Sequence, residues 1–369
     1  MTIRRTAVSL LALAAVLGVV ACESAPPPAP PPVYVAPPPP PLPNLALSQN
    51  IIDQAAVYQG YLQRASAIAT PFSDGPAIQS GLRVGQAYEA GQLQRGAVAY
   101  GAVVALQDPT FVAAVREFGR DPTQRAQLVQ RLLTEPGYAV SFNGSATAAG
   151  LVTSAIGGQA STLLAAGRRV KQQAYDIQHE RWSSEPIPGR PERLALAQTV
   201  GRQTLVATPT DSEPLRMAAY GQAPMGVTGT TASPPYTPAV ARSLAIAAIA
   251  AMGEADGANA AAVDNLLADP SSLTCLNLSK LMLYQCLSVA RPHYEDVFCL
   301  GQHILIDTAN CLTRSVGGAI EAPAVVTSIP TSATQVTPVA RSSVQAAAAS
   351  GARRGAAART PARRGSSRR

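Results

Sequence analysis

The spacing of hydrophobic residues between Leu45 and about Gly318 is typical of amphipathic helices. Apolar side chains return at intervals of three and four residues, as they must to share one face of a helix with 3.6 residues per turn. The pattern therefore predicts an all-α protein built as a helical bundle. Windows that show it include Ile51/Ile52/Ala55/Tyr58/Leu62, Phe111/Val112/Val115/Phe118 and Leu128/Val129/Leu132/Leu133.

Asp-Pro pairs mark three of the predicted helix starts: Asp108-Pro109, Asp121-Pro122 and Asp269-Pro270. An aspartate before a helix can accept hydrogen bonds from the free backbone N–H groups of the first turn. Proline suits the first helical position, where no N–H is needed. Ser48 stands in the same place before the first apolar window. We expect these four residues to cap helices.

Glycines recur inside two of the helical windows, as Gly81/Gly85 and Gly91/Gly96/Gly101. Glycine costs about 1 kcal/mol relative to alanine inside a helix. A compensating gain in packing is expected, and the simplest one is the close approach of two helices. The sequence therefore predicts Gly- and Ala-mediated helix packing.

The helical pattern of apolar residues is least regular between residues 183 and 238, where nine prolines interrupt the chain. One short helix is expected inside it, over Arg193–Val206. We interpret 208–238 as a Pro/Gly-rich linker. It would separate a helical domain at 45–207 from a second one at 239–318.

Residues 137–167 carry no charged side chain, and the latter part is rich in Ala, Gly, Ser and Thr. Two interpretations are open. The stretch could be a central helix buried in the bundle, or a segment that inserts into a membrane. Its weak hydrophobicity and its hydroxyl groups favour the buried helix.

The N-terminus has the organisation of an export signal. Arg4 and Arg5 precede an apolar run over residues 10–20, which is too short to span a bilayer as a helix. The run ends in Val19-Val20-Ala21-Cys22, and over residues 1–22 the chain resembles the signal of bacterial lipoproteins. The resemblance implies removal of residues 1–21 and attachment of acyl chains to Cys22. Lipoproteins retained at the inner membrane carry Asp at the position that Glu23 occupies here. The resemblance therefore implies location at the outer membrane, facing the periplasm or the cell surface.

A proline-rich segment follows Cys22, with twelve prolines between Ala25 and Pro43. Such a run forms extended polyproline II, which acts as a semi-rigid spacer. We interpret residues 22–44 as a lipidated stalk. A ligand for a proline-recognition groove is the alternative.

The net charge of +7 conceals an uneven distribution. Residues 322–369 hold eight arginines and no acid, whereas the chain between the signal and this tail is slightly acidic. The tail, 319–369, has no apolar period and is expected to be disordered.

Because the signal directs export, we expect anionic envelope polymers as partners of the tail and no nucleic acid. A solubilising tail without a partner is the alternative. The candidate contacts are Arg353, Arg354, Arg359, Arg363, Arg364, Arg368 and Arg369.

Four cysteines lie within 37 residues near the C-terminal end of the helical region: Cys275, Cys286, Cys299 and Cys311. An even, clustered set in an exported chain predicts disulfides. We expect one helix from Asp269-Pro270 to Arg291-Pro292, which holds Cys275 and Cys286, and a second from about Tyr294 to Leu312, which holds Cys299 and Cys311. Pairing within either helix would span about 16–18 Å, beyond the 7 Å reach of a disulfide. The short turn at Arg291-Pro292 excludes parallel helices. The remaining arrangement is an antiparallel hairpin with Cys286–Cys299 near the turn and Cys275–Cys311 at the open end. It resembles twin-cysteine helical hairpins of the mitochondrial intermembrane space, as convergent architecture.

A metal site is the competing interpretation of this region. Cys299 and His303 would share a helix face, and His293 lies close in sequence, so the three could bind zinc. Together with Glu295 and Asp296 they form the densest polar group in the chain. No common nucleophile, phosphate-binding or zinc-protease motif is present.

These observations predict a lipid-anchored envelope protein that acts as a non-enzymatic scaffold or as an accessory subunit of an envelope or secretion system, without a cofactor. It would contact the membrane through its anchor, and another envelope protein is a further expected partner. Two alternatives stay open. One is a metal-dependent enzyme or metal-binding protein that uses the His293–His303 region, and the other is a membrane-inserting protein that uses residues 137–167.

Overall fold

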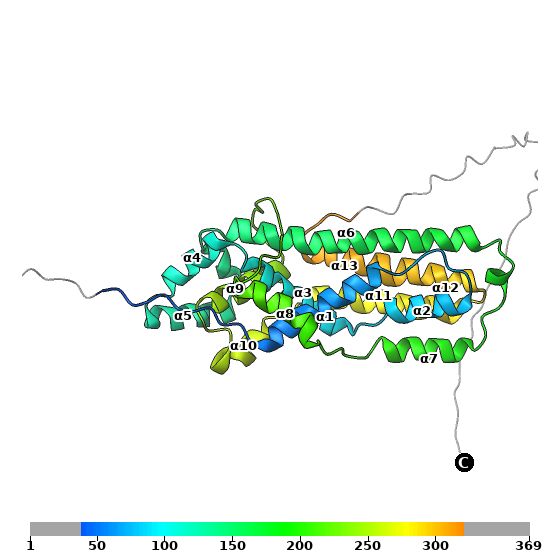
Figure 1. Cartoon of the computed structure of the whole chain (residues 1–369), viewed down its shortest axis with the longest axis horizontal. Helices are drawn as coiled ribbons and strands as arrows, with labels where there is room; N and C mark the ends of the chain where they lie inside the picture. The colour runs from blue at the N-terminus through cyan, green and yellow to red at the C-terminus, as the bar shows by residue number, and fades with distance from the viewer. Residues whose placement is uncertain (1–37, 321–369) are drawn as a thin grey trace, which may run out of the picture. The chain divides into compact units, whose positions relative to one another are not determined.

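The computed structural model describes residues 38–320, which form helices and connections without a β-strand (Figure 1). The all-α prediction is confirmed. In chain order the helices are α1 Gln49–Ser66, α2 Gly75–Gly85, α3 Ala90–Ala105, α4 Pro109–Phe118, α5 Pro122–Thr134, η1 Pro136–Ser141, α6 Ser145–Ile177, η2 Trp182–Ser184, α7 Arg190–Val200, α8 Pro209–Ala219, α9 Pro238–Ala251, η3 Gly257–Asn259, α10 Ala260–Asn265, α11 Pro270–Val289, α12 His293–Cys299, η4 Leu300–Ile306 and α13 Asp307–Ser315.

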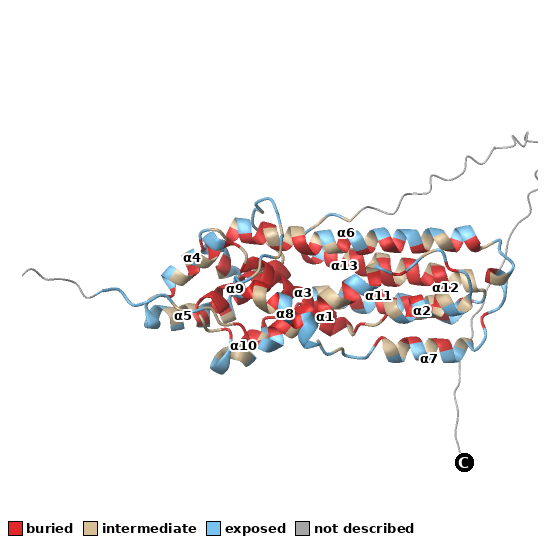
Figure 2. Cartoon of the chain, viewed as in Figure 1, coloured by how far each residue is buried: buried red, intermediate tan, exposed pale blue. Residues whose placement is uncertain are grey.

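The centre of the bundle is formed by α3 and α9, which pack against each other (Figure 2). Nearly every residue of α3 is buried, and α1 covers its other side. Both central helices consist largely of Ala, Gly and Val, so their backbones can approach closely on all sides. A helix that is apolar all round belongs inside a bundle.

The uncharged stretch before Arg168 is not the central helix that the sequence favoured. It forms most of α6, which is buried along one face and exposed along the other. Hydroxyl-bearing and small residues such as Ser161, Thr162 and Ala165 face solvent. Small side chains without charge were sufficient to cover the outer surface of a long helix, and the absence of charge therefore did not indicate burial.

Two of the four predicted side-chain caps are confirmed, and two are not formed. The Asp108 and Asp121 carboxylates accept hydrogen bonds from the backbone N–H groups of Phe111 and Gln124, each at 2.8 Å. Asp269 instead accepts from the Ser271 and Ser272 hydroxyl groups. Ser48 precedes α1, but its hydroxyl makes no cap hydrogen bond.

Close approach at glycine is confirmed where α3 crosses its neighbours. A Cβ atom added to Gly96 would lie 2.6 Å from Tyr58 Cβ and 2.7 Å from the Gln54 carbonyl oxygen on α1. A Cβ atom added to Gly101 would lie 2.4 Å from Ser243 Oγ on α9. A side chain at Gly96 would therefore require the α1 backbone to move, and one at Gly101 would require at least the Ser243 side chain to move.

The stretch predicted as a linker, 208–238, does not separate two bodies. It contains α8, which packs on α1 and α3, and the described residues form one compact unit. The predicted domains at 45–207 and 239–318 are therefore packed together, since α9 belongs to the same core as α3. The short helix expected at Arg193–Val206 lies at Arg190–Val200.

Within residues 38–320, no single helix is both long and apolar enough to cross a membrane. The pair α3 and α4 meets the length and composition requirement only together, with a bend of 88° between them. The membrane-inserting alternative for residues 137–167 remains a prediction.

Candidate functional site

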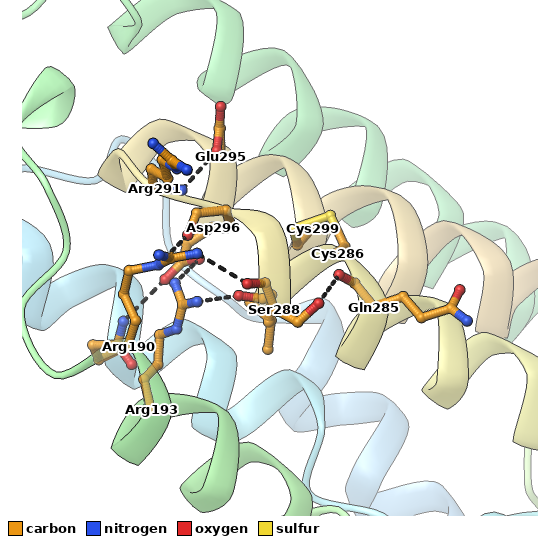
Figure 3. Close-up of polar contacts among 12 residues, drawn as sticks. Arg190, Arg193, Gln285, Cys286, Ser288, Arg291, Glu295, Asp296 and Cys299 are labelled. Atoms are coloured by element: carbon orange, nitrogen blue, oxygen red, sulfur yellow. Dashed lines mark hydrogen bonds and ion pairs between the residues drawn. A yellow bond between two sulfur atoms is a disulfide. The ribbon is translucent and has the colours of Figure 1, made fainter.

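The candidate site lies where α11 turns into α12 and where α6 and α7 pack against that turn (Figure 3). Helix α11 ends at Val289, and α12 begins directly after Pro292. Proline cannot continue the preceding helix, so it fixes the turn. The Ile187 N–H donates to the Arg291 carbonyl oxygen at 2.8 Å, which ties the chain between α6 and α7 to the same turn.

Both predicted disulfides form. Cys286 on α11 pairs with Cys299 at the end of α12, with Cα atoms 5.7 Å apart. Cys275 near the start of α11 pairs with Cys311 on α13, with Cα atoms 5.6 Å apart. The hairpin is thus cross-linked near its turn and at its open end. Its second arm is less regular than predicted, because a π-helical segment, η4, separates α12 from α13.

A buried ion pair joins α7 to the hairpin. The Arg193 guanidinium donates through Nη1 to Asp296 Oδ1 and through Nη2 to the Leu287 carbonyl oxygen. Both side chains are almost fully buried, at 4 % and 0 % exposure. Gln79 Nε2 donates to the second carboxylate oxygen at 3.2 Å. Burial raises the pKa of Asp296 to about 6, although Arg193 and Gln79 act to lower it.

Arginines of α7 also cap the C-terminus of α11. Arg190 donates to the carbonyl oxygens of Ala290 at 2.7 Å and of Ser288 at 2.9 Å. The last carbonyl groups of a helix have no partner within the helix and carry partial negative charge. Two guanidinium groups from α7 therefore neutralise one helix end, and Figure 3 shows them converging on it.

The predicted metal-ligand set is not assembled. The Cys299 sulfur is bonded to Cys286 and is not free to bind a metal. His303 Nδ1 lies 3.0 Å from Asp307 Oδ2. His293 packs near the Trp182 ring, and its Nδ1 is buried without a hydrogen-bond partner. In the described part of the chain, no group of three or more His, Cys, Asp or Glu side chains could hold a metal ion.

An apolar cavity of about 550 Å³ opens beside the Cys286–Cys299 disulfide. Its walls come from the end of α6, the end of α11 and the outer side of α12. Ligand pockets are commonly of this size, with apolar and aromatic walls and a few polar groups. The residues that line it are Ala174, Tyr175, Gln178, Cys286, Val289, Ala290, Arg291, Tyr294, Glu295, Phe298 and Cys299. The sequence placed Cys286, Glu295 and Cys299 in one region, but it did not indicate that Tyr175 of α6 would line the same cavity.

Lys280 is a second buried charged group that the sequence did not reveal. Its ammonium donates to the carbonyl oxygens of Gln86 at 2.6 Å and Gly201 at 3.1 Å. It also lies 3.8 Å from the centroid of the Tyr88 ring. Burial lowers the pKa of Lys280 to about 7. The signal that could have identified it is its position as the single charged residue among twenty on α11.

Cys22 and the arginines of the tail lie outside the described residues, so their roles remain predictions. Comparisons with protein-family models, with curated proteins and with solved structures gave no match.

Proposed function

We propose that this chain is an exported, lipid-anchored protein of the bacterial envelope, with a helical body that serves as a non-enzymatic scaffold or accessory subunit. The observation that carries the proposal is the pair of hairpin disulfides in a chain that begins with a lipoprotein-like signal. Disulfides persist in oxidising compartments such as the bacterial periplasm. The signal and the disulfides are separate features of the chain, and both indicate export.

The polar groups of the candidate site support a structural role. Arg190, Arg193 and Asp296 hold α7 against the hairpin, and Lys280 fastens α11 to the α2–α3 and α7–α8 connections. Each of these charges is engaged by a backbone carbonyl group or by an opposite charge. A body held together in this way can present a fixed surface to a partner. The stalk at 22–44 would hold that body away from the membrane, and the tail arginines would contact anionic envelope polymers.

Labelling with radioactive palmitate, followed by membrane fractionation, tests the anchor. The proposal predicts label on the native chain and recovery in the outer-membrane fraction. Cys22→Ser should abolish the label. The matched variant Glu23→Asp should keep the label and move the protein to the inner-membrane fraction. An unlabelled native chain would exclude lipidation at Cys22.

A further inference from the structure

The cavity beside the Cys286–Cys299 disulfide gathers exposed apolar surface at one place. Three aromatic side chains line it, Tyr175 from α6 and Tyr294 and Phe298 from α12. Val289, at the end of α11, lines the same cavity and is 71 % exposed, and Tyr175 is 47 % exposed. Exposed apolar side chains that surround a hollow are typical of a binding site.

The walls of this cavity are fixed before any ligand enters. The disulfide joins the end of α11 to the end of α12. The Phe298 ring packs edge-on against the Tyr175 ring, with 6.3 Å between the centroids, so α12 is also held against α6. A cavity formed in advance costs little conformational entropy on binding. Its volume of about 550 Å³ is sufficient to enclose most of a small molecule.

Two charged side chains line the cavity, and they differ in what already engages them. Oε2 of Glu295 accepts a hydrogen bond from the Arg291 backbone N–H at 2.8 Å, so this carboxylate helps to hold the turn before α12. The Arg291 guanidinium, in contrast, makes no hydrogen bond or ion pair with any residue in the described range 38–320. The charge that remains available to a ligand is therefore positive.

This combination of apolar walls and one available guanidinium defines the chemistry of the ligand. A guanidinium binds a carboxylate or a phosphate through two parallel N–H groups. A neutral apolar molecule would leave Arg291 without a partner, and a cationic one would meet a like charge. A molecule with an apolar body and a single anionic head group satisfies both parts of the site.

We propose that this cavity binds an amphipathic anion, with its apolar body against Tyr175, Tyr294 and Phe298 and its head group on Arg291. This binding goes beyond the scaffold role and needs neither the lipid anchor nor the tail. Its failure would therefore leave the function proposed above untouched.

Titration calorimetry of the full chain with three ligands of equal chain length tests the proposal. The blank contains the same lipid or detergent without the protein. Decanoate should bind at one site per chain, at least about tenfold more tightly than decan-1-ol, because only the carboxylate can pair with a guanidinium. Decylammonium should bind no more tightly than the alcohol. Equal affinities for decanoate and decan-1-ol, or tighter binding of decylammonium, would overturn the proposal.

Substitution of Arg291 tests the position of the head group. Arg291→Gln should lower the affinity for decanoate at least about tenfold and leave the affinity for decan-1-ol within about twofold, which also shows that the variant folds. Arg216→Gln, on α8 and away from the cavity, is the matched control and should change neither affinity. Decanoate affinity that is unchanged in Arg291→Gln would show that this guanidinium does not bind the head group.

Photolabelling tests the position of the apolar body. Decanoate that carries a diazirine at its methyl end should label the peptide that contains Tyr175 or the peptides within residues 289–299. An excess of unlabelled decanoate should suppress this labelling. Labelling confined to other parts of the chain would place the ligand outside the cavity and would overturn the proposal.

Discussion

At the scale of single residues, the fold depends on buried charged side chains. Arg193 and Asp296 are both buried, and each makes further hydrogen bonds besides the ion pair. A buried pair contributes little net stability relative to apolar residues of the same shape, but a single remaining partner is costly. The arrangement therefore fixes where α7 lies and makes the fold sensitive to the loss of either residue.

Removal of Arg193 is expected to destabilise the protein strongly. Arg193→Leu leaves the Asp296 carboxylate buried without its partner and should lower the free energy of unfolding by about 3–5 kcal/mol. Urea unfolding followed by circular dichroism measures the change. Arg216→Leu, which removes a solvent-exposed pair with Glu213, is the control and should cost far less, because water screens that pair. Equal effects of the two substitutions would contradict this account of the buried pair.

Lys280 gives the stability a pH dependence of defined sign. Its pKa is about 7 in the folded chain and 10.5 ordinarily, so between these values the unfolded chain binds more protons. The free energy of unfolding should therefore rise with pH above 7, by up to about 1.4 kcal/mol per pH unit from this group.

The comparison of the native chain with Lys280→Met isolates this contribution. Urea unfolding at pH 7 and pH 9 should show that the stability difference between the two proteins shifts in favour of the native chain at the higher pH. A difference that stays constant with pH would show that Lys280 keeps its ordinary pKa. A shift toward the methionine variant would contradict a lowered pKa outright.

At the scale of helices, much could be predicted from the sequence. The Asp-Pro starts located three helices. Cysteine spacing, together with the short turn at Arg291-Pro292, selected one of three disulfide connectivities. These features depend on residues that are close in sequence. The cap of α11 by Arg190 and Arg193 and the contribution of Tyr175 from α6 to the cavity could not be predicted, because both depend on how distant helices pack. The segment η4 was missed because its seven residues are too few for a π-helical period to be distinguished from an α-helical one.

The two disulfides should contribute unequally to the stability of the hairpin. The loops that they close span 13 and 36 residues, and the loss of chain entropy on closing them corresponds to about 3 and about 4 kcal/mol. Paired Cys→Ser substitutions should show this order in urea unfolding, with the Cys275/Cys311 pair the more destabilising. The reverse order would mean that packing around the sulfur atoms outweighs loop closure.

Close packing of α3 on α1 predicts opposite effects of alanine at two helical glycines. Gly96→Ala should cost about 1–3 kcal/mol, because the new methyl group meets the backbone and Cβ of α1. Gly158→Ala on α6, where no atom lies within 4 Å of the added Cβ, should stabilise by about 0.5–1 kcal/mol. Thermal unfolding of both variants measures the difference. Stabilisation by alanine at both positions would contradict the close crossing.

At the scale of the whole molecule, the described residues form one unit where the sequence predicted two domains. Prolines between 183 and 238 suggested a division, yet α8 and α9 on either side of the last proline-rich segment both pack on α3. The local amino-acid composition predicts that a segment is irregular, but it does not predict whether the helices on either side of that segment share a core. Calorimetry should therefore give a single unfolding transition, and two separate transitions would contradict a shared core.

The central claim is that an export signal, a lipid anchor and a disulfide-clamped helical body belong to one mature protein. Mass spectrometry of the chain purified from membranes under non-reducing conditions tests these features together. The account predicts an acylated N-terminal peptide that begins at Cys22, together with linked peptides for Cys275–Cys311 and Cys286–Cys299. An N-terminal peptide that still contains residues 1–21, found with four free thiols in the hairpin, would contradict it.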